Sequence, residues 1–182
     1  MLYMMRHGKT DWNAVLRLQG RTDIPLNDEG RQMARDAREK NKAMHFDICY
    51  CSPLLRAKET AEIFFEGSDT PIVYDDRLRE MSFGIFEGME DYRSVKEGPI
   101  YDLFYAPERF TGTPEGETFA NLYARTCSIL NERILPDVAS GKNVLIIGHG
   151  AMNSSIACQI NHTCRKDYWK LSIGNCELHK LL

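Results

Sequence analysis

Short, almost continuously apolar runs alternate along this chain with longer segments in which apolar and polar residues are mixed. The apolar runs have the length and composition of buried β-strands, and they are residues 1–5, 46–51, 71–75 and 143–148. The mixed segments are rich in helix-forming residues, and they are residues 27–44, 52–65, 116–139 and 149–160. Strands that alternate with helices predict an α/β fold with three layers (α/β/α) and a mostly parallel central sheet.

Local signals place the ends of several of these elements. Asn27 or Asp28 is suited to cap the first long helix. Ser52 and Pro53 occupy the places typical of an N-cap and of a first helical residue. At the end of the chain, the alternation of residues within 176–182 predicts a short edge strand.

The stretch from Met81 to Glu115 interrupts the alternation of strands and helices. It holds glycines, prolines and many aromatic residues, and no regular period continues through it. The chain of 182 residues is long enough for a substantial core, and it shows no linker or repeat. We therefore expect a single domain over residues 1–182, with an irregular, lid-like insertion at about 81–115.

Composition narrows the classes of function. The net charge of −3 and the pI near 6.0 argue against a nucleic-acid partner, so any anion site must be a local cluster. No apolar stretch approaches the length of a membrane span, and the first apolar run lacks the features of a signal peptide. We expect a cytoplasmic protein with no membrane partner, whose six cysteines are reduced thiols. The pattern indicates no particular oligomeric state.

Basic residues gather where the predicted strands end. Arg6 and His7 follow the first strand, and Arg56 lies in the first turn of the helix after the second. His149 follows the strand at 143–148. In a parallel sheet with right-handed crossovers these ends meet at one edge. Two arginines and two histidines there predict an anion pocket, because guanidinium groups match the geometry of phosphate oxygens.

A pocket of this kind suits phosphoryl transfer. A neutral imidazole is a competent nucleophile toward phosphorus, and positioning and charge stabilisation do most of the remaining work. A departing alkoxide also needs a proton donor. Glu80 lies just beyond the third predicted strand, at the same edge of the sheet. Glu87 and Glu117 lie in or beside the irregular region and are alternative donors.

Five short motifs follow one another along nearly the whole chain, and together they resemble the histidine phosphatase superfamily. The similarity is to the branch that holds phosphoglycerate mutase and the small metal-independent phosphatases, and it implies a phosphoglycerate mutase-like fold. The motifs are "MRHGKTDWN", "SPLLRAKETAE", "LREMSFGIFEG", "TPEGET" and "IGHGAMNSS". One departure is Lys9, because the common form of the first motif has Glu at that position.

The resemblance also implies a role for each matching residue. His7 would be the nucleophile that becomes phosphohistidine, and Glu80 would protonate the leaving group and then activate water. The phosphoryl group and its transition state would be held by Arg6, Arg56 and His149. The implied catalytic residues are His7, Glu80, His149, Arg6 and Arg56. The implied substrate-binding residues are Arg6, Asn13, Gln19, Gly20, Arg56, His149 and Gly150, with no metal and no other cofactor.

The implied activity is hydrolysis of a small phosphorylated metabolite, as in the small bacterial phosphatases such as alpha-ribazole phosphatase. Mutases of the superfamily carry a longer insertion with a His-Tyr-Gly element after the acid-bearing segment, and "EMSFGIFEG" lacks that element. Mutase-type phosphoryl transfer stays an alternative. Two others are a non-catalytic module that binds phosphorylated ligands, and a metal-dependent hydrolase that uses His7, His149 and nearby carboxylates.

Overall fold

A computed structural model describes all residues, 1–182, and its centre is a five-stranded sheet. The strands lie in the order β3-β2-β4-β1-β5, and β5 alone runs antiparallel to its neighbour. Their bounds are β1 Leu2–Arg6, β2 Ile48–Cys51, β3 Ile72–Tyr74, β4 Val144–Gly148 and β5 Leu178–Lys180. The mostly parallel sheet and the final edge strand are thus confirmed.

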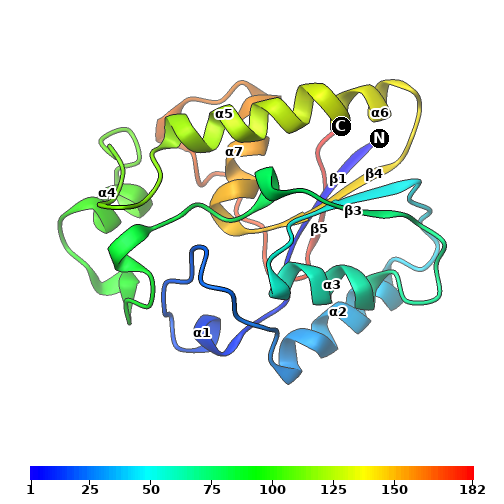
Figure 1. Ribbon diagram of the computed structural model, residues 1–182, viewed down its shortest axis with the longest axis horizontal. Coiled ribbons are helices and arrows are strands. Elements are labelled where there is room, and N and C mark those ends of the chain that lie inside the picture. The colour runs from blue at the N-terminus through cyan, green and yellow to red at the C-terminus, as the bar shows by residue number, and fades with distance from the viewer.

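Helices cover both faces of the sheet, which confirms the three-layer α/β/α architecture (Figure 1). On one face lie α2 (Asp28–Lys40) and α3 (Leu55–Phe64), and they pack against each other. On the other lie α5 (Phe119–Ile129), α6 (Leu135–Ala139) and α7 (Gly150–Asn161). No helix has the length and apolar run that crossing a bilayer requires.

The strands divide their side chains between two cores, because successive residues of a strand point to opposite faces. Met4 and Ile146 belong to the larger cluster, beneath α5 and α7, whereas Met5, Leu145 and Ile147 belong to the cluster beneath α2 and α3. All five side chains are fully buried. Burial on both faces explains why the strands at 1–5 and 143–148 are almost continuously apolar.

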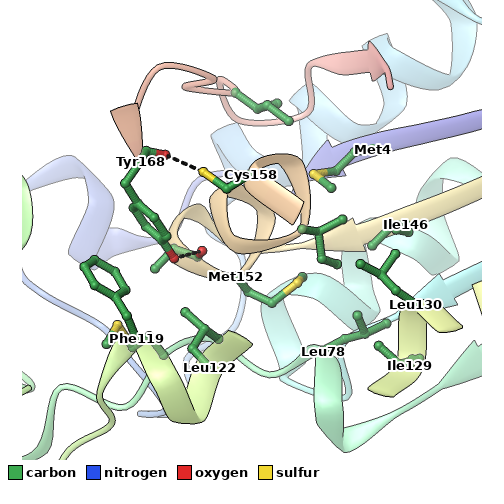
Figure 2. Packing of buried hydrophobic residues seen from close by; sticks show 14 of the residues in the cluster. Met4, Leu78, Phe119, Leu122, Ile129, Leu130, Ile146, Met152, Cys158 and Tyr168 are labelled. Carbon is green, nitrogen blue, oxygen red and sulfur yellow. Dashed lines mark hydrogen bonds between the residues drawn. The ribbon is translucent and has the colours of Figure 1, made fainter. Parts of the chain in front are cut away.

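Tyr168 extends the larger core from the segment that follows α7 (Figure 2). Its ring lies 4.3 Å from that of Phe119, and its hydroxyl donates to the carbonyl oxygen of Ala151 at 2.6 Å. The side chain is fully buried, so this hydrogen bond satisfies a polar atom that has no access to water. Tyr168 thereby connects the C-terminal segment to the first turn of α7, which carries part of the site.

Three local expectations were wrong. Ser52 and Pro53 precede α3, which begins at Leu55 with Leu54 as its N-cap, so neither starts the helix. The stretch at 116–139 is not one α-helix, because residues Leu130–Ile134 form a π-helical turn between α5 and α6. The following Pro136 cannot donate a backbone hydrogen bond, which accounts for a local change of helical pattern.

The segment at 81–115 contains a helix that the pattern did not predict. This is α4 (Pro99–Tyr105), which begins with a proline in its first turn. Short 3₁₀ turns at Gly84–Phe86 and Tyr92–Ser94 precede it. In Figure 1 the segment lies at the end of the molecule toward which β1 runs, beside α1 (Asp11–Ala14).

Candidate active site

A cavity of about 360 Å³ opens at the carboxyl ends of the parallel strands. A cavity of this volume is of the size that binds small molecules. The sequence-predicted residues that line it are Arg6, His7, Asn13, Gln19, Gly20, Arg56, Glu80 and Gly150. Its other walls are Arg17, Leu18, Phe83, Tyr92, Arg93, Phe104, Tyr105, Ala151, Trp169 and Ser172.

The two histidines meet because β1 and β4 are parallel neighbours whose last residues, Arg6 and Gly148, stand opposite each other. The His7 amide donates to the carbonyl oxygen of Gly148 at 3.0 Å, and the His7 and His149 rings lie 5.1 Å apart between centroids. His149 is fully buried and is not among the residues that line the cavity, but its ring contacts that of His7. The structure therefore places His149 directly beside the cavity-lining His7.

Hydrogen bonding fixes which nitrogen of His7 is free. Its Nδ1 lies 2.6 Å from the carbonyl oxygen of Gly8, and because a carbonyl oxygen only accepts, Nδ1 carries the proton. Nε2 of the neutral ring therefore keeps its lone pair and faces no protein donor. The amide of Gly8 is itself bonded to Thr60 Oγ1 at 3.0 Å, which holds the turn after β1 in place. This is the arrangement that a nitrogen nucleophile requires.

Both imidazoles are held in the neutral form. Burial lowers the pKa of His7 well below its usual value of 6.5, and the positive charges of Arg56 and Arg6 lower it further. Burial likewise lowers the pKa of His149 well below 6.5, with Arg56 as the next cause. At neutral pH the site thus combines two uncharged histidines with two charged arginines.

We expect acid to destabilise the fold through these two histidines. Below about pH 6.5 the unfolded chain binds protons that the folded chain excludes, so the free energy of unfolding falls as the pH falls. Each buried imidazole lowers the free energy of unfolding by up to about 1.4 kcal/mol for every unit by which the pH falls below 6.5, until the pH reaches the pKa of that imidazole in the folded protein. Thermal unfolding of the wild type, His149→Gln and the exposed-site control His45→Gln, from about pH 7.5 to 5.0, checks this. Equal pH slopes for all three proteins would contradict it.

The two arginines have different surroundings. Arg56 is 1% exposed and donates from Nη1 to Thr22 O at 2.9 Å and from Nη2 to Gly20 O at 2.7 Å, while its Nε has no partner. Burial lowers the pKa of Arg56 to about 10, which still leaves it charged at neutral pH. Arg6 makes no side-chain hydrogen bond to the protein, and its buried Nε is unpartnered. Both guanidinium groups therefore keep donors available for an anion.

The structure distinguishes the three carboxylates that were considered as proton donors. Glu80 is the one that lines the cavity, and it is 8% exposed. Glu87 instead accepts hydrogen bonds from Arg21 N, Thr22 N and Thr22 Oγ1, which ties the loop after Gly20 to the irregular segment. Glu117 pairs with two arginines outside the cavity. Glu87 and Glu117 therefore have structural contacts that account for their positions.

The other predicted contact residues also reach the cavity. Asn13 Oδ1 accepts from Thr10 N at 3.1 Å in the capping box of α1, which leaves the Asn13 amide nitrogen without a protein partner. Gln19 is 8% exposed, and its Oε1 is buried without a donor. Gly20 has a φ of +57°, and a Cβ there would collide with the carboxylate of Glu87. Glycine is thus required for the turn that brings Gln19 to the cavity.

Arg125 is a supporting residue that the sequence patterns did not identify. From α5 it donates to the carbonyl oxygens of Arg77 and Arg79, both at 2.7 Å, and to that of Glu80 at 3.0 Å. Its Nε also donates to Glu117 Oε1 at 2.9 Å, and both side chains are 14% exposed. Arg125 therefore fixes the backbone that carries Glu80. Its separation from Glu80 in the sequence left no local signal for this contact.

Replacing Arg125 with methionine is expected to lower both stability and activity. The substitution removes the side-chain donor to the carbonyl oxygens of Arg77 and Arg79 and one donor each to Glu80 O and Glu117, at a cost of about 2–4 kcal/mol in the free energy of unfolding. We expect kcat to fall more than KM rises, because Arg6 and Arg56 stay in place in the cavity wall. Denaturant unfolding and steady-state kinetics check this, with the exposed, unpaired Arg133→Met as control. An Arg125→Met protein that matches Arg133→Met would contradict it.

The residues described do not include a cluster of three or more histidine, cysteine, aspartate or glutamate side chains in a metal-binding arrangement. Four arginines line the cavity, and two of them, Arg6 and Arg56, lie close enough to His7 for their charges to act on its ring. The cavity can therefore bind an anion, offer it a neutral nitrogen nucleophile, and supply a carboxylate for proton transfer.

Comparisons with known proteins agree with this chemistry. The family described as histidine phosphatase superfamily (branch 1) matches residues 2–182. A Bacillus subtilis (strain 168) protein named "Uncharacterized phosphatase PhoE" is 38% identical over 158 residues, or 87% of this chain and 76% of that protein. "2,3-bisphosphoglycerate-dependent phosphoglycerate mutase 2" of Gloeobacter violaceus is 29% identical over 97% of this chain and 82% of its own.

A solved structure shows the same fold. Bacillus stearothermophilus YhfR superimposes with a TM-score of 0.84 and is 31% identical, over 96% of this chain and 86% of that one. The likeness spans the sheet, both helical layers and the insertion, so the cavity lies within the shared architecture.

Proposed function

This chain belongs to the histidine phosphatase superfamily (branch 1), and we propose that it hydrolyses the phosphomonoester of a small phosphorylated metabolite, without a metal, through a phosphohistidine at His7. The observation that carries the proposal is the free Nε2 of a neutral His7 beside Arg6 and Arg56 in the cavity wall. Relatives named as phosphatase and as mutase support the reaction class.

In the first step, His7 Nε2 attacks phosphorus while the bond from phosphorus to the ester oxygen breaks. Arg6 and Arg56 neutralise the charge on the phosphoryl oxygens, and the leaving oxygen takes a proton from Glu80. The hydrogen bond from His7 Nδ1 to Gly8 O stabilises the positive charge of the phosphorylated ring. In the second step, Glu80 removes a proton from water, the water oxygen attacks phosphorus, and the nitrogen–phosphorus bond breaks.

Hydrolysis is favoured over mutase chemistry by the open form of the cavity. A mutase must keep its phosphohistidine from water until the product returns. Here the segment over the site is short, lacks the His-Tyr-Gly element, and leaves Tyr105 at the cavity wall 52% exposed. We therefore expect this wall to leave a phosphohistidine at His7 open to attack by water.

The test is release of inorganic phosphate from 4-nitrophenyl phosphate in the presence of EDTA. We expect chelator-resistant turnover. Turnover that EDTA abolishes and a divalent cation restores would identify a metal-dependent hydrolase. Binding without turnover would identify a phospho-ligand module, and isomerisation of phosphoglycerate faster than hydrolysis would identify a mutase.

The outer part of the cavity is proposed to contact the leaving group. Its walls include a row of rings in which Tyr92 lies 4.8 Å from Phe104, and Phe104 lies 5.2 Å from Trp169. Tyr105 lines the same part and donates to the carbonyl oxygen of Arg93 at 2.9 Å. All of these except Trp169 belong to the insertion at 81–115, which is thereby proposed to select the substrate.

Tyr105→Ala is expected to change substrate preference. Loss of an aromatic contact lowers kcat/KM for aryl phosphates by about 3- to 10-fold relative to glycerol phosphate. Tyr101→Ala is the matched control, because Tyr101 stacks on Tyr105 at 5.2 Å but does not line the cavity. Competition kinetics with an aryl phosphate and glycerol phosphate give the ratio of the two kcat/KM values. The same ratio in wild type, Tyr105→Ala and Phe104→Ala would remove the substrate-selecting role of the insertion.

A further inference from the structure

A buried serine contacts the second histidine of the site. Ser52 Oγ lies 2.7 Å from His149 Nε2, and both residues are fully buried. The pair is built by the sheet, because β2 and β4 are parallel neighbours and each residue directly follows its strand. The Ser52 amide also donates to the carbonyl oxygen of Ile147 at 3.0 Å. Backbone pairing therefore fixes the two side chains against each other.

The protons of this pair have one consistent arrangement. A serine hydroxyl has one proton to donate, and Ser52 Oγ already accepts from Leu54 N at 3.3 Å. Its other polar neighbour is His149 Nε2. If Nε2 were the donor, the buried hydroxyl proton would have no acceptor, which costs about 1–3 kcal/mol. The hydroxyl therefore donates to Nε2, and the proton of the neutral imidazole lies on Nδ1.

His149 Nδ1 is then a donor with nothing in the protein to bind. It is buried and has no hydrogen-bond partner, although the ring it belongs to is 5.1 Å from that of His7. A buried donor beside the nucleophile is suited to an oxygen of the group that the nucleophile receives. The alternative tautomer would present a lone pair at Nδ1, which repels an anionic oxygen.

We propose that Ser52 is a positioning residue that holds His149 as the Nδ1–H tautomer, so that an uncharged His149 donates a hydrogen bond to the phosphoryl group on His7. The tautomer follows from the contacts alone, and its use in phosphoryl transfer rests on the proposed function. Ser52 was expected to cap α3, and this contact accounts for a fully buried serine at a position where no helix starts.

The tautomer is measured by long-range ¹H–¹⁵N NMR of the histidine side chains, with signals assigned by comparison with His149→Gln. The wild type is expected to show a protonated Nδ1 and an unprotonated Nε2 at His149. Ser52→Ala is expected to shift the ring toward a mixture of tautomers, and Ser52→Thr to restore the wild-type pattern. A protonated Nε2 in the wild type overturns the proposal, whether or not the protein hydrolyses esters.

The functional part is measured with Ser52→Ala and the control Ser155→Ala. Ser155 is equally buried on α7, but its hydroxyl bonds to Thr126 Oγ1 at 2.9 Å, away from the site. We expect Ser52→Ala to lower kcat by about 10- to 100-fold. This loss is smaller than the loss in kcat that follows complete removal of a hydrogen-bond donor to the transition state. Ser52→Thr should recover most of that loss. Equal kcat values for Ser52→Ala and Ser155→Ala overturn the link to catalysis, whereas no hydrolysis by the wild type overturns the proposed function.

Discussion

Replacing His7 with alanine is expected to abolish hydrolysis of 4-nitrophenyl phosphate, with a loss in kcat of about 10⁴-fold or more. The reason is specific to this position. Nδ1 is engaged by Gly8 O, the ring is kept neutral by burial and by two arginines, and Nε2 faces the cavity. No other imidazole lines the cavity, so nothing replaces the nucleophile. Steady-state kinetics in EDTA provide the measurement.

Two further measurements separate the loss of a nucleophile from the loss of the fold. Thermal unfolding of His7→Ala should show a folded protein, since the substitution removes a polar ring from a buried position. Rapid quenching of the wild type during turnover should trap a phosphoryl group on the peptide that holds His7 and not on the one that holds His149. The control His45→Ala, which changes an exposed imidazole, should keep full activity. Turnover by His7→Ala would disprove nucleophilic catalysis by this residue.

Patterns along the chain could predict the sheet and the edge where the site lies. The runs at 1–5 and 143–148 are apolar because each is covered on both faces, and burial of this kind is visible without any structure. A His-Gly pair follows each of these two runs, and parallel pairing of β1 with β4 brings the two pairs together. The geometry of His7 and His149 therefore follows from local sequence combined with one rule of sheet topology.

Contacts between distant segments could not be predicted in this way. Arg125 lies 45 positions from Glu80, and Ser52 lies 97 positions from His149. Neither pair has a periodicity or a spacing that marks it, because each is formed only when layers pack. Ser52 is instructive, since its local context is typical of an N-cap. The Ser52 hydroxyl instead forms a hydrogen bond with His149, and α3 begins three residues later.

For Arg56, the position of the side chain could be predicted from the sequence, but its hydrogen bonds could not. Its position early in α3 indicated an arginine at the sheet edge, and the structure places it in the cavity wall. Its hydrogen bonds to Gly20 O and Thr22 O were not foreseeable, and they show that one guanidinium both shapes the loop after Gln19 and faces the anion site. Activity and loop structure are therefore coupled at Arg56, whereas Arg6, which makes no side-chain hydrogen bond, can act on the ligand alone.

Glu80→Gln is expected to lower kcat for alkyl phosphates by about 10²–10⁴-fold, the usual contribution of a positioned acid or base. Glu80 Oε1 accepts from Met81 N at 2.8 Å and from Met152 N at 3.0 Å, and Oε2 accepts from Ala151 N at 3.1 Å. These bonds hold the carboxylate at the start of α7. An amide keeps the shape but neither loses a proton nor accepts from all three amides, so catalysis falls more than substrate binding.

The choice of ester separates the two roles proposed for Glu80. With 4-nitrophenyl phosphate the leaving group departs without a proton, so Glu80→Gln should phosphorylate His7 readily and then stall, because the carboxylate that activates water is gone. The expected result is a burst of 4-nitrophenolate, about one equivalent of enzyme, followed by slow turnover. Glu87→Gln serves as the control at a second, partly buried carboxylate and should show no burst, since Glu87 ties the loop at Arg21 and Thr22 rather than reaching the cavity. If Glu80→Gln instead hydrolyses both esters at wild-type rates, proton transfer in this site belongs to another group.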